Sequence, residues 1–256
     1  MCIRDRLNTY QKFLFKICLI TSVIIIMLPM QSHAQEYKNQ PHDFRQQYDN
    51  LRKNNLIDKS TTYKQWKKFQ EENYRAKYQM EQEAQQEMKK EQYQTFSKKK
   101  KFKPRRGDIL ITNNASYAKL GIPGHAAIYT GKGHIVEIRG YGHHPARNSY
   151  KKFIHNKRAK RHDKLWVKVY RTSKKKRNKA ANWALKQAGQ KRKSITYSLN
   201  SNINDTYHTY CSKLVWQSYY FGAGKKSVNS TGVYHYFNPY NLPKNIKGAK
   251  KVKTFF

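Results

Sequence analysis

The position of Cys211 is the strongest constraint on this 256-residue chain. Cys211 lies in the run Thr-Tyr-Cys-Ser-Lys-Leu-Val-Trp at 209–216, which predicts a thiol in the first turn of an apolar helix. The other cysteines, Cys2 and Cys18, lie in a segment with the composition of a removable leader. A mature chain with one cysteine closes no internal disulfide. The thiol is therefore a packing residue, a redox or intermolecular thiol, or a nucleophile.

The first 34 residues have the pattern of a secretory signal peptide. Four basic residues precede an uncharged apolar run from Ile17 to Met30, and Ser32-His33-Ala34 supplies a small-residue ending. The apolar run has 14 residues, whereas a membrane span needs roughly 20. We therefore expect cleavage after Ala34 and a bacterial protein that is secreted or associated with the cell wall. An uncleaved N-terminal anchor is the alternative.

The chain is strongly basic. Its formal net charge at pH 7 is +38, and because the leader carries four basic residues and one acid, the remainder carries about +35. The sequence contains no zinc-finger spacing, RNP-like run or basic heptads, so we expect no specific nucleic-acid partner. For an exported protein, the expected partners are anionic cell-wall polymer or peptidoglycan peptides, with an anionic membrane surface as a further candidate. A solvated basic surface without a partner is the alternative.

Two regions of different composition follow the leader. Residues 35–103 hold ten acids and 17 Lys/Arg and are rich in Gln, which predicts a charged helical spacer that ends in a basic linker. The run from Ser60 to Thr62 can cap a helix that extends toward Gln94. Aromatic residues at three- and four-residue steps predict a packing seam along this helix: Tyr63, Trp66, Phe69, Tyr74 and Tyr78. We expect no chemistry in this spacer.

The second region, residues 104–256, is large enough to bury one core. It balances 32 Lys/Arg with only four acids: Asp108, Glu137, Asp163 and Asp205. Turn and capping signals predict four strands and two helices: 108–112, 125–129, 134–138 and 165–170 for the strands, 174–188 and 210–221 for the helices. Because these strands and helices do not alternate regularly, the pattern favours an α+β fold over a doubly wound parallel sheet.

A base for the thiol must come from the histidines, because a neighbouring imidazole, like a helix N-terminus, favours the thiolate. His125 opens a predicted strand directly after Gly124, where backbone and substrate can approach closely. If the hairpin turn centres on Gly131-Lys132, position 125 faces 137 or 138, so Glu137 is a candidate to orient the ring. A one-residue slip would turn Glu137 to the other face. His134 is the competing partner, and a plain surface role for Glu137 also stays open.

An oxyanion needs hydrogen-bond donors fixed beside the nucleophile. The backbone N–H of Cys211 is one such donor. Three side chains and one glycine complete the candidates for oxyanion or substrate binding: Tyr210, Tyr197, Gly124 and Asp108. The adjacent pair His143-His144 lacks the spacing and the third ligand of a metal site. We therefore expect neither a metal nor another cofactor.

Four segments occur in a fixed order: Gly107-Asp-Ile-Leu, Gly124-His-Ala-Ala-Ile-Tyr-Thr-Gly131, Ile135-Val-Glu137 and Tyr210-Cys-Ser-Lys-Leu-Val-Trp216. Together they resemble the permuted papain-like cysteine hydrolases, the YiiX-like branch of the NlpC superfamily, in which histidine precedes cysteine. The resemblance covers about residues 104–246, and the stretches 189–197 and 237–243 look like two further elements of the family. The insertion 139–165 is unusually basic, and Ser198 stands where the family often has Asp after a tyrosine.

The resemblance implies a circularly permuted papain-like fold, a small antiparallel sheet packed on the cysteine-bearing helix. It implies that Cys211 is the nucleophile, His125 the base and Glu137 the polar third member, with Tyr210 at the oxyanion site. The implied activity is that of a cysteine amidase or endopeptidase working through a thioester, most readily on peptidoglycan stem peptides, whose carboxylates suit a basic domain. Two alternatives stay open: an acyltransferase or lipid-acyl hydrolase of the same fold, and a non-catalytic cationic cell-wall-binding protein.

Overall fold

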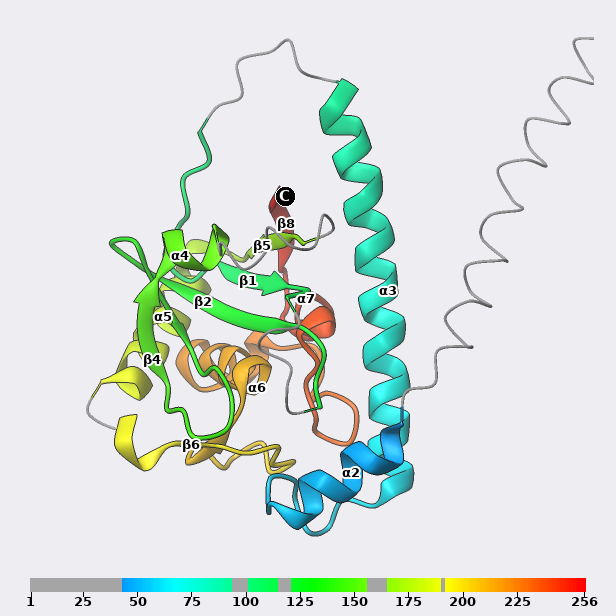
Figure 1. Cartoon of the computed structure of the whole chain (residues 1–256). Coiled ribbons are helices and arrows are strands. Elements are labelled where there is room, and N and C mark those ends of the chain that lie inside the picture. The colour runs from blue at the N-terminus through cyan, green and yellow to red at the C-terminus, as the bar shows by residue number, and fades with distance from the viewer. Residues whose placement is uncertain (1–42, 94–100, 115–120, 156–164, 190–191) are drawn as a thin grey trace, which may run out of the picture. The chain divides into compact units, whose positions relative to one another are not determined.

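A long helix and a six-stranded antiparallel sheet dominate the computed structural model (Figure 1), which describes residues 43–93, 101–114, 121–155, 165–189 and 192–256. The expected α+β class is confirmed. Residues 44–256 form one compact unit, and the domain boundary predicted at residue 103 falls within it. The predicted signal peptide lies outside the described residues.

The main sheet has the strand order β4-β3-β2-β1-β5-β8, and all neighbouring strands in it are antiparallel. Its strands are β1 Ile109–Thr112, β2 His125–Gly131, β3 His134–Glu137, β4 Ala146–Ser149, β5 Val167–Arg171 and β8 Lys250–Phe255. Two short parallel strands form a second sheet: β6 Thr196–Tyr197 and β7 His208–Thr209. The four predicted strands are confirmed. The two edge strands, β4 and β8, were missed because both are polar and lack the alternation of a half-buried strand.

The helices are α2 Phe44–Lys53, α3 Tyr63–Tyr93, α4 Tyr150–Ile154, α5 Lys174–Ala188, α6 Cys211–Gln217 and α7 Leu242–Asn245. Both helices expected in the second region are present, and α6 continues into a π-helical turn, Ser218–Gly222, which ends at the glycine that the sequence indicated. Within the described ranges, no helix combines the length and the apolar character needed to cross a membrane.

The sheet separates two apolar clusters because successive side chains of a strand point to opposite faces. The larger cluster contains strand residues together with side chains from α3, α5 and α6, among them Ile109, Ile111, Ala126, Ile128, Val136, Ala180 and Leu214. The smaller cluster packs the opposite face against α4: Leu110, Ala127, Tyr129, Ile135, Phe153 and Val167. All seven residues of α6 are buried, so this helix is fixed in the larger core.

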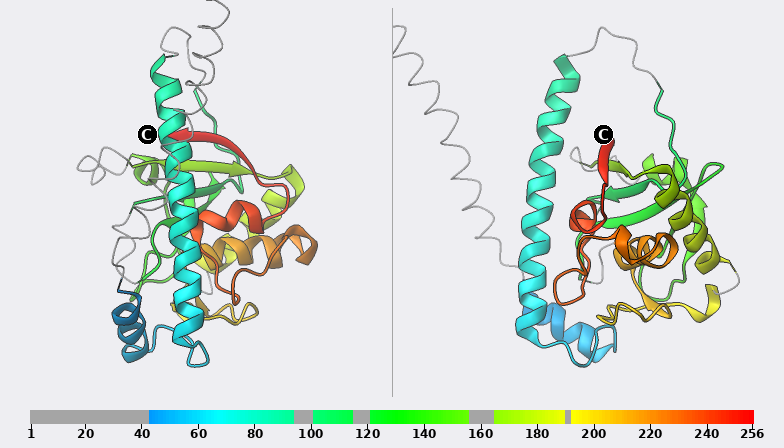
Figure 2. Two further views of the ribbon diagram at one scale, coloured as in Figure 1. Left: turned by 90° about the vertical axis from the view of Figure 1, so that its right-hand side faces the viewer. Right: turned by 180° about the vertical axis from the view of Figure 1, so that it is seen from behind.

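Helix α3 is part of the same folded unit as the sheet. A capping box starts it: the Gln65 N–H donates to the Thr62 hydroxyl, and the Thr62 N–H donates to the Gln65 side chain. Trp66 and Phe69 are fully buried, and their ring centroids lie 6.3 and 5.3 Å from that of Tyr236. This part of the predicted aromatic seam is confirmed as packing, and Figure 2 shows α3 running alongside the sheet.

An acidic row, Glu83, Glu87 and Glu91, fastens the second half of α3 to the edge of the sheet. These residues are four apart and therefore share one face of the helix. Glu83 pairs with the Lys168 ammonium at 2.9 Å, Glu87 pairs with Lys251 and Thr254, and Glu91 pairs with Lys253 at 3.0 Å. The partners lie on β5 and β8. The charged surface of the predicted spacer is thus used for an intramolecular contact.

Candidate active site

Cys211 occupies the first position of α6. Tyr210 precedes it in an extended conformation (φ −140°, ψ 174°) and forms the N-cap, so the thiol enters the helix at its positive end. Cys211 is 5% exposed and belongs to the larger core. The His125 ring and the Ala126 N–H stabilise the thiolate, and the Ser212 hydroxyl, which donates to the Phe237 carbonyl oxygen, lies 3.9 Å from the sulfur. The thiol therefore lies beside the first residues of β2.

The loop that precedes His125 is held by a close contact between Gly124 and Tyr240. Gly124 has φ +85°, and a Cβ atom there would lie 2.4 Å from the Tyr240 hydroxyl. Only glycine fits, because both the backbone conformation and the space exclude a side chain. The sequence suggested that Gly124 makes room for substrate; in the structure Tyr240 fills that room. Gly124 thus positions the first residue of β2.

The His125 ring is hydrogen-bonded to the carboxylate of Glu137, with 2.7 Å between Nε2 and Oε2. Both side chains are 1% exposed. Ile128 pairs with Val136, so the same register places Glu137 opposite Ala127, diagonally across from His125 and on the same face. The predicted pairing of position 125 with 137 or 138 was therefore wrong by one or two positions, but His125 and Glu137 do share a face. His134, the competing partner, instead hydrogen-bonds the Lys132 carbonyl oxygen.

Two residues that the sequence did not indicate hold the other oxygen of Glu137. Its Oε1 accepts hydrogen bonds from Arg139 Nε at 3.0 Å and from Asn148 Nδ2 at 2.9 Å. Asn148 lies on β4, where it pairs with Ile135, one strand away from the carboxylate. The carboxylate thus has a partner at each oxygen, and its orientation toward His125 is fixed.

The three side chains favour an imidazolium–thiolate pair. Burial opposes ionisation of Glu137, but the hydrogen bond and charge of His125, with Arg139, lower its pKa below the usual value. Burial also opposes protonation of His125, but the charges and hydrogen bonds of Cys211 and Glu137 outweigh it and raise its pKa to about 9. Burial likewise opposes the Cys211 thiolate, but the His125 charge and hydrogen bond lower the thiol pKa. A thiolate at neutral pH is a competent nucleophile.

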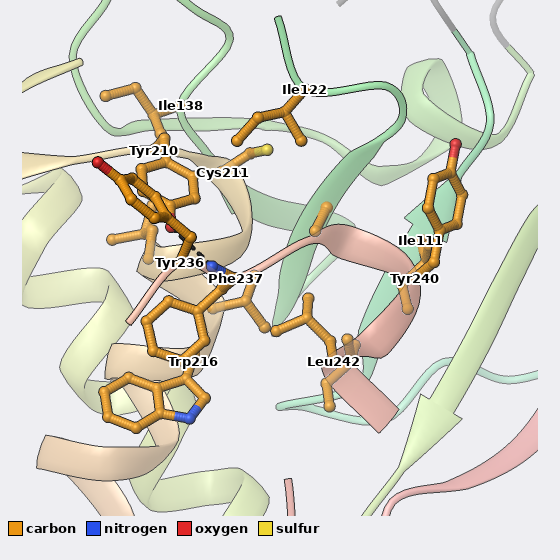
Figure 3. Packing of buried hydrophobic residues seen from close by; sticks show 14 of the residues in the cluster. Ile111, Ile122, Ile138, Tyr210, Cys211, Trp216, Tyr236, Phe237, Tyr240 and Leu242 are labelled. Atoms are coloured by element: carbon orange, nitrogen blue, oxygen red, sulfur yellow. Dashed lines mark hydrogen bonds between the residues drawn. The ribbon is translucent and has the colours of Figure 1, made fainter. Parts of the chain in front are cut away.

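The tyrosine candidates for the oxyanion site have different environments. The Tyr210 hydroxyl is buried and accepts the Phe237 N–H at 2.8 Å, and Figure 3 shows the Cys211 sulfur pointing away from that hydroxyl. The structure therefore gives Tyr210 a packing role. Burial and the Cys211 charge raise the pKa of Tyr197, so its phenol stays protonated close to the thiol. Both hydroxyls can still donate, and Tyr197 stays a candidate donor at the oxyanion site.

The Cys211 N–H is the other donor that the structure favours. As the first residue of α6, Cys211 has no intrahelical acceptor for this group. The N–H is attached to the nucleophilic residue itself, so it lies where an oxyanion forms after attack by the thiolate. Together with Tyr197, it supplies two donors beside the thiol.

Asp108, another candidate, lies away from this constellation. Thr112 pairs with His125 in the β1–β2 register, and Asp108 precedes the other end of β1, roughly 13 Å away along the strand. Its carboxylate is fully buried and accepts from Arg171 Nε at 2.8 Å and Arg171 Nη2 at 2.7 Å, with a third bond from the Arg105 N–H. The structure does not bring Asp108 beside Cys211; Asp108 forms a buried ion pair that joins the start of β1 to β5.

Asn148 provides a test of how Glu137 is supported. Asn148→Ala removes one donor to Glu137 Oε1, and we expect alkylation of Cys211 by iodoacetamide at pH 7 to slow about fivefold, because a hydrogen bond to a charged group is lost. The rate is measured by mass spectrometry of the labelled chain. Asn229→Ala, which removes a hydrogen bond to the Lys244 carbonyl oxygen, is the matched control. Equal slowing in both variants would contradict a specific role for Asn148.

Comparisons with known proteins agree with this site. A curated Bacillus thuringiensis protein described as an uncharacterized 30.3 kDa protein is 32% identical over 159 residues, which are 58% of this chain and 57% of that relative. No solved structure matches the chain. A family model described as lipoprotein N-acylation protein LnsA-like matches residues 77–255 and bears out the resemblance at the level of papain-like cysteine enzymes. The match includes the Cys211–His125–Glu137 constellation, and the chain belongs to this LnsA-like family.

Proposed function

We propose that the protein is a cysteine acyltransferase that carries an acyl group on Cys211 and passes it to an amine. The observation that carries this proposal is the position of His125, which contacts Cys211 on one side and Glu137 on the other. This is the nucleophile, base and orienting carboxylate of covalent acyl transfer. The family description, which names lipoprotein N-acylation, supports an amine as the acceptor.

The first half-reaction forms the thioester. The Cys211 thiolate attacks the carbonyl carbon of an acyl ester, and the oxyanion is stabilised by the Cys211 N–H and the Tyr197 hydroxyl. The ester C–O bond breaks, and the protonated His125 gives its proton to the departing alkoxide. The product is an acyl thioester on Cys211 with His125 neutral. Glu137 keeps the ring in one orientation throughout.

The second half-reaction releases the acyl group as an amide. A neutral amine attacks the thioester carbonyl carbon, and His125 accepts the proton that the nitrogen loses. The C–S bond breaks, which restores the thiolate and the imidazolium. Both half-reactions are balanced with respect to protons, and this chain supplies the side chains that they need.

Burial of the site favours transfer to an amine over transfer to water. Cys211, His125 and Glu137 are at most 5% exposed. A thioester intermediate survives until an acceptor arrives only when water is kept from it. We propose a lipid acyl ester as the donor and the amine of a lipid-modified protein as the acceptor, with the reaction outside the cytoplasm after export by the N-terminal leader.

Peptidoglycan chemistry is the second candidate. In that case the protein is an amidase or endopeptidase of the permuted YiiX-like branch, and the thioester is hydrolysed. The basic surface favours it, because 32 Lys/Arg face four acids in residues 104–256 and stem peptides carry free carboxylates. A cationic cell-wall-binding protein without activity would also use this surface, but it would have no need of the paired thiol and imidazole.

Mass spectrometry of two reactions separates these candidates. The full chain is incubated with phospholipid vesicles that contain a lipopeptide with a free amine, and separately with purified peptidoglycan. We expect the lipopeptide to gain the mass of one acyl chain with wild type but not with Cys211→Ala, while the wall fragments stay unchanged. Released wall peptides without lipopeptide acylation would contradict the acyltransferase and establish the amidase. Identical results for wild type and Cys211→Ala in both reactions would contradict both enzymes.

A further inference from the structure

We infer that the docking face, formed by Tyr141, Arg192, Lys193 and Tyr207, binds an anionic membrane surface. The inference rests on the proposed function in one respect, since a lipid acyl donor has to be reached in its bilayer. The exposed tyrosines, the hydrogen bonds and the basic residues that support it do not depend on that function.

The two most exposed large apolar side chains in the described part of the chain both lie on the docking face. Tyr141 is 61% and Tyr207 is 54% exposed. Tyr141 follows Glu137 by four residues, and Tyr207 precedes Cys211 by four residues. The segments that carry Glu137 and Cys211 thus each present an exposed aromatic ring four residues away. Tyrosine rings are enriched at membrane–water interfaces, where one end is apolar and the other is hydrated.

Hydrogen bonds join the segments of the docking face. His144 Nδ1 lies 2.6 Å from the Ile195 carbonyl oxygen, which ties the loop after β3 to β6. The Thr196 N–H donates to the Tyr207 carbonyl oxygen at 2.8 Å, which ties β6 to the segment before α6. In Figure 1 the loop between β3 and β4 approaches β6 at one end of the sheet. The two tyrosines are therefore presented from one connected rim.

The loop that carries Tyr141 exposes its side chain to solvent. Gly140 and Gly142 flank the tyrosine, with φ values of 151° and 75°. A Cβ atom at Gly142 would meet no atom within 4 Å, so the loop has open space beside it. The ring can therefore enter a lipid headgroup layer without displacing protein atoms.

Charge on and around the docking face fits an anionic partner. Arg192 and Lys193 are exposed on the docking face, whereas nearby Arg139 is paired with Glu137 and Arg147 contacts the His134 ring. Two of the acids that the structure describes in residues 101–256, Asp108 and Glu137, are buried in ion pairs with arginines. Asp205 lies two residues before Tyr207, where it accepts hydrogen bonds from the Tyr207 N–H and the His208 ring. Each basic residue close to an anionic bilayer strengthens binding to it, and salt weakens that contribution. The exposed acids of the described chain lie instead on or beside α2 and α3.

A membrane explains this combination better than a wall polymer. Carboxylates and phosphates of the wall would satisfy the basic residues, but two exposed rings flanking the site also need an apolar or interfacial contact. A bilayer supplies both at once, and it holds the acyl chains that a thioester enzyme would use. The docking face would thus bring the segments that carry Glu137 and Cys211 to the lipid headgroups.

Vesicle flotation of the full chain tests the inference. Cys211→Ala serves as the parent, so that binding is measured without turnover. We expect partition into phosphatidylglycerol-containing vesicles to exceed partition into pure phosphatidylcholine, and to fall in about 0.5 M NaCl, which screens surface charges. Tyr141→Ser with Tyr207→Ser, and separately Arg192→Gln with Lys193→Gln, should each reduce partition about tenfold. Phe256→Ser and the pair Lys225→Gln with Lys226→Gln are matched controls that should change little, since both alter exposed residues outside the docking face.

A fluorophore attached to the docking face reports membrane contact at that position, so vesicle binding by the apolar leader does not affect the result. In a chain carrying Cys2→Ser, Cys18→Ser and Cys211→Ala, an environment-sensitive fluorophore is attached through Tyr141→Cys or, as control, through Phe256→Cys. Anionic vesicles should shift the emission of the first to the blue and leave the second unchanged. Equal emission at both positions, or retention by peptidoglycan with no vesicle response, would overturn the docking face. Because the readout is independent of acylation, failure of the enzyme assay leaves this result interpretable.

Discussion

His125→Ala should lower kcat/KM for lipopeptide acylation by about a thousandfold, and Cys211→Ala should abolish the acyl-enzyme. His125 donates a proton to the leaving group and removes one from the attacking amine, so both half-reactions lose their proton transfer. Its loss also removes the positive charge that lowers the pKa of Cys211, while the burial that raises this pKa remains. The thiolate population at pH 7 therefore falls. Kinetics of acylation and trapping of the hydroxylamine-sensitive thioester measure the two effects.

The pH dependence of thiol alkylation gives an independent test of the pair. The lowered pKa of Cys211 and the pKa of about 9 for His125 define a window in which thiolate and imidazolium coexist. Alkylation of Cys211 in the wild type should begin at a pH below the range in which an ordinary thiol ionises. The rate of acyl transfer should rise with pH as Cys211 ionises. It should fall again near pH 9, where His125 loses its proton. In His125→Ala the alkylation limb should move to higher pH.

His155→Ala is the matched control for this prediction. His155 is exposed and caps the C-terminal end of α4, so its removal should leave both the alkylation limb and kcat/KM unchanged. Circular dichroism of each variant checks that the fold is kept. A wild-type thiol that titrates in the usual range, with no change in His125→Ala, would contradict the catalytic pair.

Asp108→Ala should lower the free energy of unfolding by about 3 to 5 kcal/mol, because it leaves the Arg171 guanidinium without the bidentate partner that compensates for its partial burial. The measurement is urea denaturation followed by fluorescence of the four tryptophans. The loss should appear as a lower midpoint with little change in the slope. Asp108→Asn, which keeps the size of the side chain, should lose less.

Asp49→Ala is the control for Asp108, because the Arg45–Asp49 pair has a similar distance, 3.0 Å, but both side chains are more than half exposed. Its expected cost is at most about 0.5 kcal/mol. If Asp108 bound substrate instead, Asp108→Asn would raise KM while leaving the unfolding midpoint unchanged. That outcome would contradict the structural role.

The catalytic constellation was predictable because its signals are local in the sequence. Cys211 precedes an apolar helical run, and His125 and Glu137 flank a hairpin turn whose side-chain alternation puts both on one face. The supports of Glu137 were not predictable in the same way. Asn148 and Arg139 lie in a basic stretch without strand periodicity, and only the pairing of β4 with β3 brings Asn148 to the carboxylate.

The oxyanion candidates show where sequence reasoning ends. Tyr210 and Tyr197 were equal candidates in a chain with 20 tyrosines. Their hydroxyls differ because Tyr210 is used by the Phe237 N–H, a contact between segments 27 residues apart. Asp108 was interpreted as functional because residues 104–256 contain only four acids. Its partner, Arg171, lies 63 residues away in the sequence. Such pairings depend on the tertiary fold, which local patterns do not specify.

The family match begins at residue 77, in the middle of α3, whereas the folded unit begins before it. A chain shortened to the matched region would lose Trp66, whose ring lies against Gly121, and Gln70, which hydrogen-bonds the Gly121 carbonyl oxygen. Gly121 lies four residues before His125, in the segment that leads into β2. The region that the family model matches is therefore smaller than the folded unit, and side chains before residue 77 support the loop that leads to the candidate base.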